Sequence, residues 1–435
     1  MNPQDEPAKP DKEPVGKFRW YIGSMLFVST TLYYYDRQIP SIAVNIQSYA
    51  REIGFLTADG KIDKVLFGYI DSAHKVAYAL GFLLMGRFID WIGLKRGFAL
   101  GVGLWSCATM SFVLLHSFWP LVFGMLCLGF FQAADHPACV KTVSGWFPAS
   151  ERSDAVAFYN SGTNFGAMIV SHLVPFICLA LSWQMGYLLP GVFGLLWVAV
   201  WWFTFDPPEI NRFVGEAERR HIAGGRGVVA DTKLSWGRLF TCRSAWGFAI
   251  AKLLIDPVWF LYLSWLPMYF NEKYHVNIKD LFVPITLVYA LSLVGNLVGG
   301  RLSSYWLRKG WNINRARKGA MLLFALMAVP SFLAGFTSNV WIVVAIVGWA
   351  TFAHQAYSTL LYTTVTDVFP KEVVGSVTGF GGMFGAIGGA FITISAGYIA
   401  NLFGYTPLFF LGTFAYLTGL GILHALNPRL EPEKL

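Results

Sequence analysis

An aspartate and an arginine, Asp36 and Arg37, lie side by side inside the first long apolar stretch of this sequence, from Phe18 to about Val44. A charge in hydrocarbon costs about 3 kcal/mol or more, so an ionic pair at such a place is a functional hypothesis. One interpretation is a neutralised pair that only fixes helix packing. The other is a site where an ionic solute or a proton is handled inside a membrane protein.

Further ionisable residues lie in other apolar stretches at spacings that suit a helix. Asp71 and Lys75 are four residues apart, so they share a helix face and can neutralise each other, with His74 beside Lys75. They form either a pair that reaches for water or part of a site. Asp135 and His136 are adjacent in a later stretch, where a desolvated carboxyl group or an imidazole could exchange a proton.

The second half of the chain offers its own polar residues within apolar stretches. Lys252 and Asp256 repeat the four-residue spacing, for which structural pairing is the better interpretation. His354 and Gln355 bring hydrogen-bonding groups into another apolar stretch. We keep both as candidate substrate contacts, although buried structural residues would look the same.

The composition places these residues in a membrane. The 435 residues are 55% hydrophobic and only 13% charged, whereas soluble proteins have about 25% charged residues. Aromatic residues make up 17% and glycines number 44, as is usual for packed membrane helices with interfacial aromatic belts. Five scattered cysteines show neither metal-binding nor disulfide spacing. We therefore expect the lipid bilayer to surround the protein.

Twelve segments are apolar enough and long enough to span a bilayer, since a spanning helix needs about 20 residues. They lie at roughly 18–46, 64–88, 97–116, 118–145, 152–180, 183–205, 243–270, 281–305, 317–336, 339–368, 373–400 and 404–426. The sequence therefore predicts an all-α polytopic membrane protein with 12 transmembrane helices.

Lysines and arginines are concentrated in the loops after segments 2, 6 and 8, and the opposite loops carry few. By the positive-inside rule, both termini are cytoplasmic in the cell membrane. The net charge of +8 then reflects this bias and implies no nucleic-acid partner. Residues 1–16 are polar and do not resemble a signal peptide. The predicted division is a cytoplasmic tail (1–17), a six-helix bundle (18–205), a cytoplasmic loop (206–242), a second six-helix bundle (243–427) and a cytoplasmic tail (428–435).

The two halves are related to each other. Phe147 and Phe369, each followed by proline, are 369 − 147 = 222 residues apart, and Gly86 and Gly300, each followed by arginine, are 300 − 86 = 214 apart. Similar offsets indicate a parallel six-helix repeat, which is the plan of major facilitator transporters: two pseudo-symmetric six-helix bundles.

The loop from Gly86 to Arg96 resembles the major facilitator signature between helices 2 and 3. We expect Asp90 to pair with basic residues as the halves rock. The second copy, from Gly300 to Arg308, has Ser304 in place of the acid. The residues expected to act in gating are Gly86, Asp90, Gly93, Lys95 and Arg96.

A narrower resemblance runs along nearly the whole chain, to the bacterial hexuronate transporters of the anion:cation symporter family, which are relatives of galactonate and sialic-acid carriers. The stretches that resemble it are 35–37, 146–152, 160–163, 256–259, 265–270, 315–318, 353–358, 379–383 and 404–407. The resemblance implies that a small anionic sugar such as glucuronate or galacturonate is taken up with protons. It implies no cofactor, and we expect a functional monomer.

The resemblance also implies roles for individual residues. Arg37 would bind the substrate, because its planar fork suits a carboxylate, and Asp36 would take the proton. Asp36 could also hold Arg37 in place when the site is empty. The sugar contacts implied by resemblance are Tyr34, Tyr78, Tyr357 and Ser358.

Helix 4 departs from the family pattern. Relatives usually have a glutamate for proton coupling with an arginine two turns earlier, where this chain has Gln132 and Met125. Either Asp135 or His136 takes over the proton function, or coupling is weaker and the protein is a facilitator or a differently coupled carrier. Gln132 stays a candidate substrate contact.

Helix 2 could supply the missing cation. Lys75 or His74 would then replace the helix-4 arginine as a ligand of the substrate carboxylate. The alternative is that Lys75 only pairs with Asp71.

Other classes of function fit less well. The sequence shows no nucleophile motif, phosphate loop or metal cluster, so we do not expect an enzyme. A non-transporting membrane sensor would need an added signalling domain, for which the chain offers only the loop and tails. The main rival is a carrier for another organic anion, such as a galactonate-like sugar acid.

Overall fold

The computed structural model describes residues 15–43, 47–54, 64–224, 236–274 and 282–433, apart from a few side chains within helices. Most of these residues are helical, and none of them is in a strand. The first half contains α1 (Phe18–Ala43), α2 (Gln47–Glu52), α3 (Lys64–Ile92), α4 (Leu94–Ser111), α5 (Phe118–Gln132), α6 (Asp135–Trp146), α7 (Ala149–Ala180) and α8 (Trp183–Thr204). The second half contains α11 (Arg243–Tyr274), α12 (Phe282–Arg308), α13 (Ile313–Ala328), α14 (Val340–Val368), α15 (Val374–Phe403) and α16 (Thr406–Leu426).

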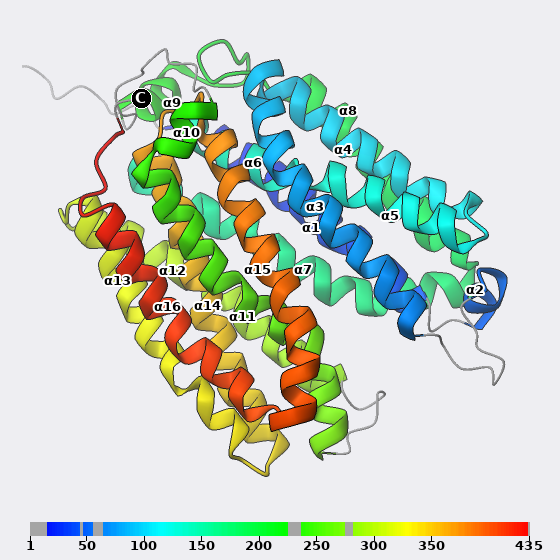
Figure 1. The fold of residues 1–435 in the computed structure, drawn as a ribbon. Coiled ribbons are helices and arrows are strands. Elements are labelled where there is room, and N and C mark those ends of the chain that lie inside the picture. Colours follow the sequence, from blue (N-terminus) through cyan, green and yellow to red (C-terminus); the bar gives the residue numbers. More distant parts are fainter. Residues whose placement is uncertain (1–14, 44–46, 55–63, 225–235, 275–281, 434–435) are drawn as a thin grey trace, which may run out of the picture.

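The helices form two bundles, one from each half of the chain (Figure 1). Two short helices of the connecting segment, α9 (Glu216–Gly224) and α10 (Trp236–Thr241), lie at the same end of the molecule as the C-terminus. The bundles come together at this end and diverge toward the end where α2 lies. The positive-inside bias of the sequence predicts that the end with α9 and α10 faces the cytoplasm.

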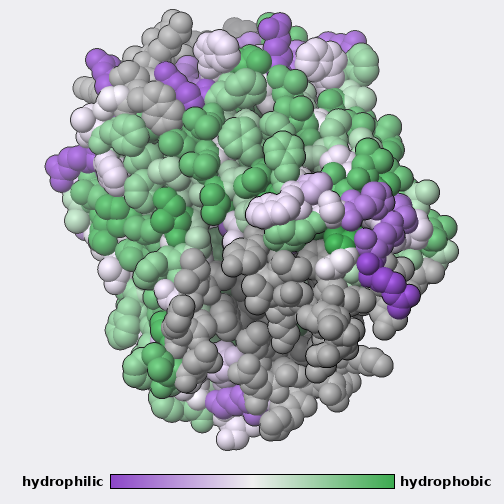
Figure 2. Space-filling model, turned by 45° about the vertical axis from the view of Figure 1, so that its right-hand side comes forward, coloured by the Kyte–Doolittle hydropathy of each residue, from purple (hydrophilic) through white to green (hydrophobic). Residues whose placement is uncertain are grey.

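The outer surface suits a bilayer. Figure 2 shows apolar residues over much of the described surface in this view, with hydrophilic residues in separate patches at the top, at the bottom and at mid-height on both edges. Among the described residues, nine helical stretches are long and apolar enough to cross a membrane. The other three predicted spans correspond to α1, α3 and α7. The all-helical architecture expected from the sequence is therefore present.

One predicted span is not a single helix. The segment 118–145 divides into α5 and α6, with a turn at Ala133 and Ala134. Pro137 explains the break, because proline has no N–H to donate to the Ala133 carbonyl, and its ring would clash with that carbonyl in a regular helix. The Ala134 N–H instead bonds the Phe131 carbonyl at 3.1 Å, three residues back. The break lies beside Gln132, Asp135 and His136.

The internal repeat has a structural counterpart where the bundles meet. The α3 helix packs on α15, and α12 packs on α7. At Gly86 an added Cβ would lie 2.3 Å from the Gly375 carbonyl oxygen, and at Gly300 it would lie 2.3 Å from that of Ser153. Both glycines that the repeat relates therefore allow a close approach of two backbones across the interface.

Part of the connecting segment packs on the first bundle. Arg19 of α1 bonds Glu151 of α7 through Nε at 2.8 Å and Glu218 of α9 through Nη1 at 3.1 Å. Glu218 is 1% exposed, so α9 is held by a buried charge pair. Residues 1–14 and 225–235 lie outside the described residues, and the division of the chain into domains stays a prediction.

Candidate functional site

A cavity of about 60 Å³ lies between the two bundles, and both supply its walls. The first bundle contributes Tyr33, Tyr34 and Arg37 of α1, Tyr78 and Phe82 of α3, His136 of α6, and Asn160 and Thr163 of α7. The second contributes Lys252, Asp256, Trp259 and Phe260 of α11, His354, Gln355, Ser358 and Tyr362 of α14, and Gly382 and Ala386 of α15. Ligand pockets usually measure about 300–1,000 Å³, so this cavity is small for a ligand site in this conformation.

Arg37 reaches the cavity within an aromatic frame. Its Nη1 donates a hydrogen bond to the Tyr33 hydroxyl at 3.3 Å. Its guanidinium carbon lies 5.9 Å from the ring centre of Tyr34, 5.4 Å from that of Tyr78 and 5.6 Å from that of Phe260. Aromatic faces attract a cation. Phe260 belongs to the second bundle, so the guanidinium contacts both halves.

Gln132 is not on the cavity wall. It supports the aromatic residues around Arg37 from the side that faces away from the cavity. Its Oε1 is 3.0 Å from His74 Nε2, and its Nε2 donates to the Tyr33 carbonyl oxygen at 3.3 Å. The Tyr33 and Tyr78 hydroxyls bond each other, and the His74 ring stacks on Tyr78 at 5.8 Å. Gln132 therefore connects α1, α3 and α5 and positions the tyrosines that surround Arg37.

The helix break places His136 on the cavity wall and Asp135 behind it. The His136 ring is 5.9 Å from that of Tyr33 and 5.5 Å from that of Tyr362 in the second bundle. Asp135 is 1% exposed and accepts a hydrogen bond from Ser29 of α1. Its Oδ2 is 3.6 Å from His136 Nδ1. The two candidates that the sequence could not separate thus form one connected group.

The second bundle brings an ion pair to the cavity. Lys252 Nζ is 2.7 Å from Asp256 Oδ2, and their side chains are 5% and 14% exposed. The Lys252 ammonium also lies 4.5 Å from the ring centre of Tyr362. The sequence favoured a structural pair at this spacing, but both residues line the cavity.

The α14 helix supplies neutral polar groups to the same wall. His354 stacks on Trp259 at 5.3 Å, and its Nδ1 is 2.9 Å from the Tyr416 hydroxyl. Gln355 and Ser358 complete this face of the cavity. Such groups can exchange hydrogen bonds with the hydroxyls of a sugar.

Asp36 and Tyr357 do not line the cavity. Asp36 is 1% exposed, and neither carboxyl oxygen has a hydrogen-bond partner among the described residues. It therefore does not hold Arg37, contrary to one expectation from the sequence. Tyr357 is buried with its ring 5.6 Å from that of Tyr416 on α16.

Lys75 is a partly buried residue of α3 that is not among the cavity-lining residues of the described chain. The side chain of Asp71 lies outside the described residues, so the predicted pair with Lys75 stays a prediction. The roles proposed for Lys75, Asp36 and Tyr357 also stay predictions.

Asp90 of the predicted gating motif joins the two bundles at the end of the molecule predicted to be cytoplasmic. Its Oδ2 accepts hydrogen bonds from the backbone N–H of Ser376 at 2.7 Å and from the Ser376 hydroxyl, at the start of α15. Its Oδ1 is 2.6 Å from Lys141 Nζ. A carboxylate near the N-terminus of a helix is favoured by the helix dipole. Asp90 therefore fastens α3 to the second bundle.

The remaining motif residues shape the turn that carries Asp90. Gly93 has φ +91°, a conformation that suits glycine. Lys95 pairs with Asp206 at 2.8 Å. Arg96 lines a separate pocket at this end, together with Asp90 and Lys95.

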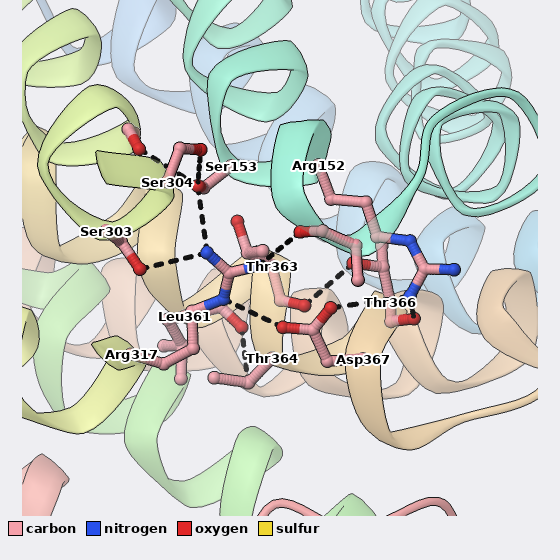
Figure 3. Close-up of polar contacts among 12 residues, drawn as sticks. Arg152, Ser153, Ser303, Ser304, Arg317, Leu361, Thr363, Thr364, Thr366 and Asp367 are labelled. Atoms are coloured by element: carbon pink, nitrogen blue, oxygen red, sulfur yellow. Dashed lines mark hydrogen bonds and ion pairs between the residues drawn. The ribbon is translucent and has the colours of Figure 1, made fainter. Parts of the chain in front are cut away.

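A second set of contacts fastens α7 to the other bundle (Figure 3). Asp367 lies between two arginines, 3.3 Å from Arg152 Nη1 and 2.8 Å from Arg317 Nε. The Ser153 hydroxyl is 2.7 Å from that of Ser304 and accepts from Arg317 Nη1 at 2.9 Å. The degenerate second copy of the motif thus contacts α7 through Ser304, as Asp90 of the first copy contacts α15.

Several cavity residues were missed in the sequence. Tyr33 lies beside a stretch that resembles the family, and Trp259 lies within one. Their residue types alone suggest packing rather than substrate contact. Asn160 lies within the stretch 160–163 that resembles the family, but its bond to Asn296 of α12 at 2.9 Å, a contact between the bundles, could not be predicted from sequence. The four-residue spacing of Lys252 and Asp256 was a further clue.

The comparisons with known proteins agree with the fold. Residues 26–393 match the family profile described as the Major Facilitator Superfamily. The chain is 28% identical to the "Hexuronate transporter" of Escherichia coli (strain K12), with 90% of each chain covered. It is 29% identical to the "Probable galactarate/D-glucarate transporter GudP" of Bacillus subtilis (strain 168), with 95% of this chain and 94% of the relative covered. These relatives confirm the resemblance seen in the sequence.

Solved structures share the fold at low identity. The proton:xylose symporter XylE, bound to 6-bromo-6-deoxy-D-glucose, superposes with a TM-score of 0.74 at 12% identity, covering 96% of this chain and 98% of its own. The human organic anion transporter TETRAN superposes with a TM-score of 0.69 at 17% identity, covering 95% of this chain and 100% of its own. With the profile matched over most of its length, the chain belongs to the Major Facilitator Superfamily.

Proposed function

We propose that this chain is a secondary active transporter that imports acidic sugars, such as hexuronates, together with protons by alternating access. The observation that carries the proposal is the position of Arg37 in the cavity between the bundles. Its planar fork can bind a carboxylate through two hydrogen bonds, and the aromatic faces around it attract the cation and help to position it. Relatives named as hexuronate and galactarate transporters support the substrate class.

The neutral groups around the cavity would bind the rest of the sugar. Tyr34 and Tyr78 offer hydroxyls and ring faces from the first bundle, and His354, Gln355 and Ser358 face them from the second. A substrate that bridges these groups draws the two bundles together, which is what a carrier with its site between repeats requires.

His136 and Asp135 are the proposed proton-coupling group, in place of the glutamate that relatives carry. His136 contacts Tyr33 in one half and Tyr362 in the other, so its charge affects how the halves meet. Asp36 is a further proton-binding residue in this proposal, since an ionised carboxylate without a partner in the bundle interior would be costly. Because Asp36 does not line the cavity, its protonation would act on the cavity indirectly, through the position of α1.

Alternating access would proceed by opening the cytoplasmic contacts. The Asp90–Ser376 and Asp367–Arg152 interactions close that end in this structure, and both would break as the halves rock. This assignment places both termini in the cytoplasm of a cell-membrane protein, acting as a monomer.

A facilitator, or a carrier for another organic anion such as a galactonate-like acid, is the alternative. The observation that favours it is Gln132, a buried amide bound to His74 at the position where the family resemblance implies an acid. A non-transporting sensor of the sugar acid is the third candidate, and accumulation against a gradient would exclude it.

Uptake of labelled glucuronate and galacturonate into proteoliposomes tests the proposal. We expect saturable uptake that Arg37→Ala abolishes, while Arg429→Ala, an exposed arginine near the C-terminus, leaves it intact. Size-exclusion profiles and melting temperatures would establish that each variant is folded. Absence of uptake of both acids by folded protein would contradict the substrate class.

A further inference from the structure

The cavity contains a cation from each bundle, and the second has no role in the mechanism above. Arg37 enters from α1, and Lys252 enters from α11 with Asp256 one turn later on the same helix. The three are the residues of the described cavity wall with full formal charges, apart from the titratable His136 and His354. A sugar with one carboxylate uses Arg37 and leaves Lys252 with Asp256.

The Lys252–Asp256 pair is held in a tight, water-poor place. Both side chains are nearly buried, and an added Cβ at Gly385 of α15 would lie 2.0 Å from Asp256 Oδ2. The Tyr362 ring covers the ammonium at 4.5 Å. Burying an ion pair gains little stability over apolar residues, so its location on the cavity wall calls for a functional account.

An ammonium has three N–H donors, and its bond to Asp256 uses one of them. Asp256 thus neutralises Lys252 while the cavity is empty, and an incoming carboxylate of similar geometry can compete for the same Nζ. We propose that Lys252 binds a second carboxylate of the substrate, so that a sugar diacid with a carboxylate at each end is preferred over a uronate. This inference rests on the proposed function and names its substrate class.

The charge balance then assigns a task to Asp256. With a monoacid, Arg37, Lys252, Asp256 and one carboxylate sum to zero. A second carboxylate at Lys252 adds a negative charge, which is balanced when Asp256 takes a proton from water in the open cavity and returns it to water after release. The titratable and charged groups that share the cavity with Asp256 are Lys252 of α11, Arg37, Tyr33 and Tyr34 of α1, Tyr78 of α3, His136 of α6, and His354 and Tyr362 of α14.

The test is competition in proteoliposomes. Unlabelled galactarate or D-glucarate competes with labelled galacturonate uptake, and unlabelled glucuronate serves as the monoacid competitor. We expect the diacids to reach half-inhibition at about 10- to 100-fold lower concentration than glucuronate, the range for one charge-assisted hydrogen bond. This preference should increase between pH 7.5 and pH 6, because the bound diacid needs a proton on Asp256.

The variant that tests the assignment is Lys252→Met/Asp256→Asn, which removes both charges and leaves no unpaired ion. We expect the half-inhibition concentration of glucuronate divided by that of the diacid to fall toward one, even if the overall rate of galacturonate uptake also changes. Lys273→Gln, which changes a lysine at the other end of α11 that does not line the cavity, should keep the ratio of the unmodified protein.

Three results would overturn the inference. The first is that the unmodified protein shows no preference for diacids. The second is that this preference does not increase at pH 6. The third is that the double variant weakens competition by diacids and by the monoacid equally. Binding of neither acid class, measured as a shift in melting temperature of folded protein, would contradict the proposed function itself and this inference with it.

Discussion

At the scale of single residues, the account depends on which side chains around Arg37 are fixed and which are available to a substrate. The guanidinium is framed by three aromatic rings and bonds the Tyr33 hydroxyl. Tyr33 is in turn fixed by Tyr78 and by Gln132. A cation positioned in this way needs little rearrangement to bind a carboxylate, which favours tight binding.

Arg37→Lys separates charge from geometry. Lysine keeps the positive charge but lacks the planar fork, so the substrate loses one of two charge-assisted hydrogen bonds, worth about 1.5–3 kcal/mol. We expect the half-saturation concentration for galacturonate uptake to rise about tenfold or more. An unchanged value, with Arg429→Lys as the matched control, would show that the substrate carboxylate binds elsewhere.

Gln132→Leu tests the support behind the cavity. The substitution deprives the buried Tyr33 carbonyl and His74 Nε2 of the amide, at about 1–3 kcal/mol for each buried polar group. We expect a lower melting temperature in detergent. Gln355→Leu changes a cavity-wall glutamine instead and should alter the dependence of uptake on substrate concentration more than the melting temperature. Equal melting temperatures for Gln132→Leu and the unmodified protein would refute the supporting role.

The sequence could predict the type of these residues but not all of their directions. Arg37, Tyr34 and Tyr78 line the cavity as expected. Asp36 does not line the cavity. Consecutive residues of a helix point about 100° apart, and the rotation of α1 about its own axis is fixed by the helices that pack against it. Tyr357 turns toward α16 for the same reason, whereas Ser358, the next residue, reaches the cavity.

At the scale of elements, the break between α5 and α6 is the feature that positions the proposed proton-coupling group. A continuous helix would set the directions of Gln132, Asp135 and His136 by a fixed rotation of about 100° per residue. The turn at Ala133 and Ala134 instead lets Gln132 bond α1 while His136 faces the cavity. Pro137, the cause of the break, is present in the sequence, but the continuous apolar run around it predicted a single helix.

Asp135→Asn tests this element. The amide oxygen can still accept from Ser29, so the helix ends should stay in place while the carboxyl proton is lost. We expect accumulation driven by a proton gradient to disappear, with substrate exchange retained. The control is Ser29→Ala, which removes the hydrogen bond and keeps the acid. Unchanged accumulation in Asp135→Asn would rule out that Asp135 replaces the glutamate of relatives.

At the scale of the whole molecule, the two bundles meet through related contacts. Asp90 of α3 bonds Ser376 of α15, and Ser304 of α12 bonds Ser153 of α7. The offsets of these pairs are 304 − 90 = 214 and 376 − 153 = 223, and they agree to within one residue with the offsets of 214 and 222 read from the sequence. The repeat was therefore predictable, but the conformation was not, because under the proposed mechanism the same sequence also forms a state that is open at the end with α9 and α10.

Asp367→Asn should weaken the contact between the bundles at the end predicted to be cytoplasmic. Asp367 and Arg317 are fully buried, and removing one partner of a buried ion pair typically costs about 3–5 kcal/mol. With the five native cysteines replaced by alanine, we expect Thr163→Cys on the cavity wall to react faster with an impermeant thiol reagent in inside-out vesicles.

The matched control is Asp154→Asn, which removes the more exposed pair with Arg308 at 3.4 Å in the same region. Exposed pairs contribute about 0–1 kcal/mol, so labelling should hardly change. Equal labelling rates in the two variants would mean that the Arg152–Asp367–Arg317 cluster does not hold the bundles together at the end predicted to be cytoplasmic.

The measurement that tests the central claim most directly is accumulation of labelled galacturonate and glucuronate in proteoliposomes under an imposed inward proton gradient. The account predicts accumulation above equilibrium that a protonophore collapses and that Arg37→Ala lacks. Uptake that only equilibrates, with or without the gradient, would contradict proton-coupled transport and make the protein a facilitator.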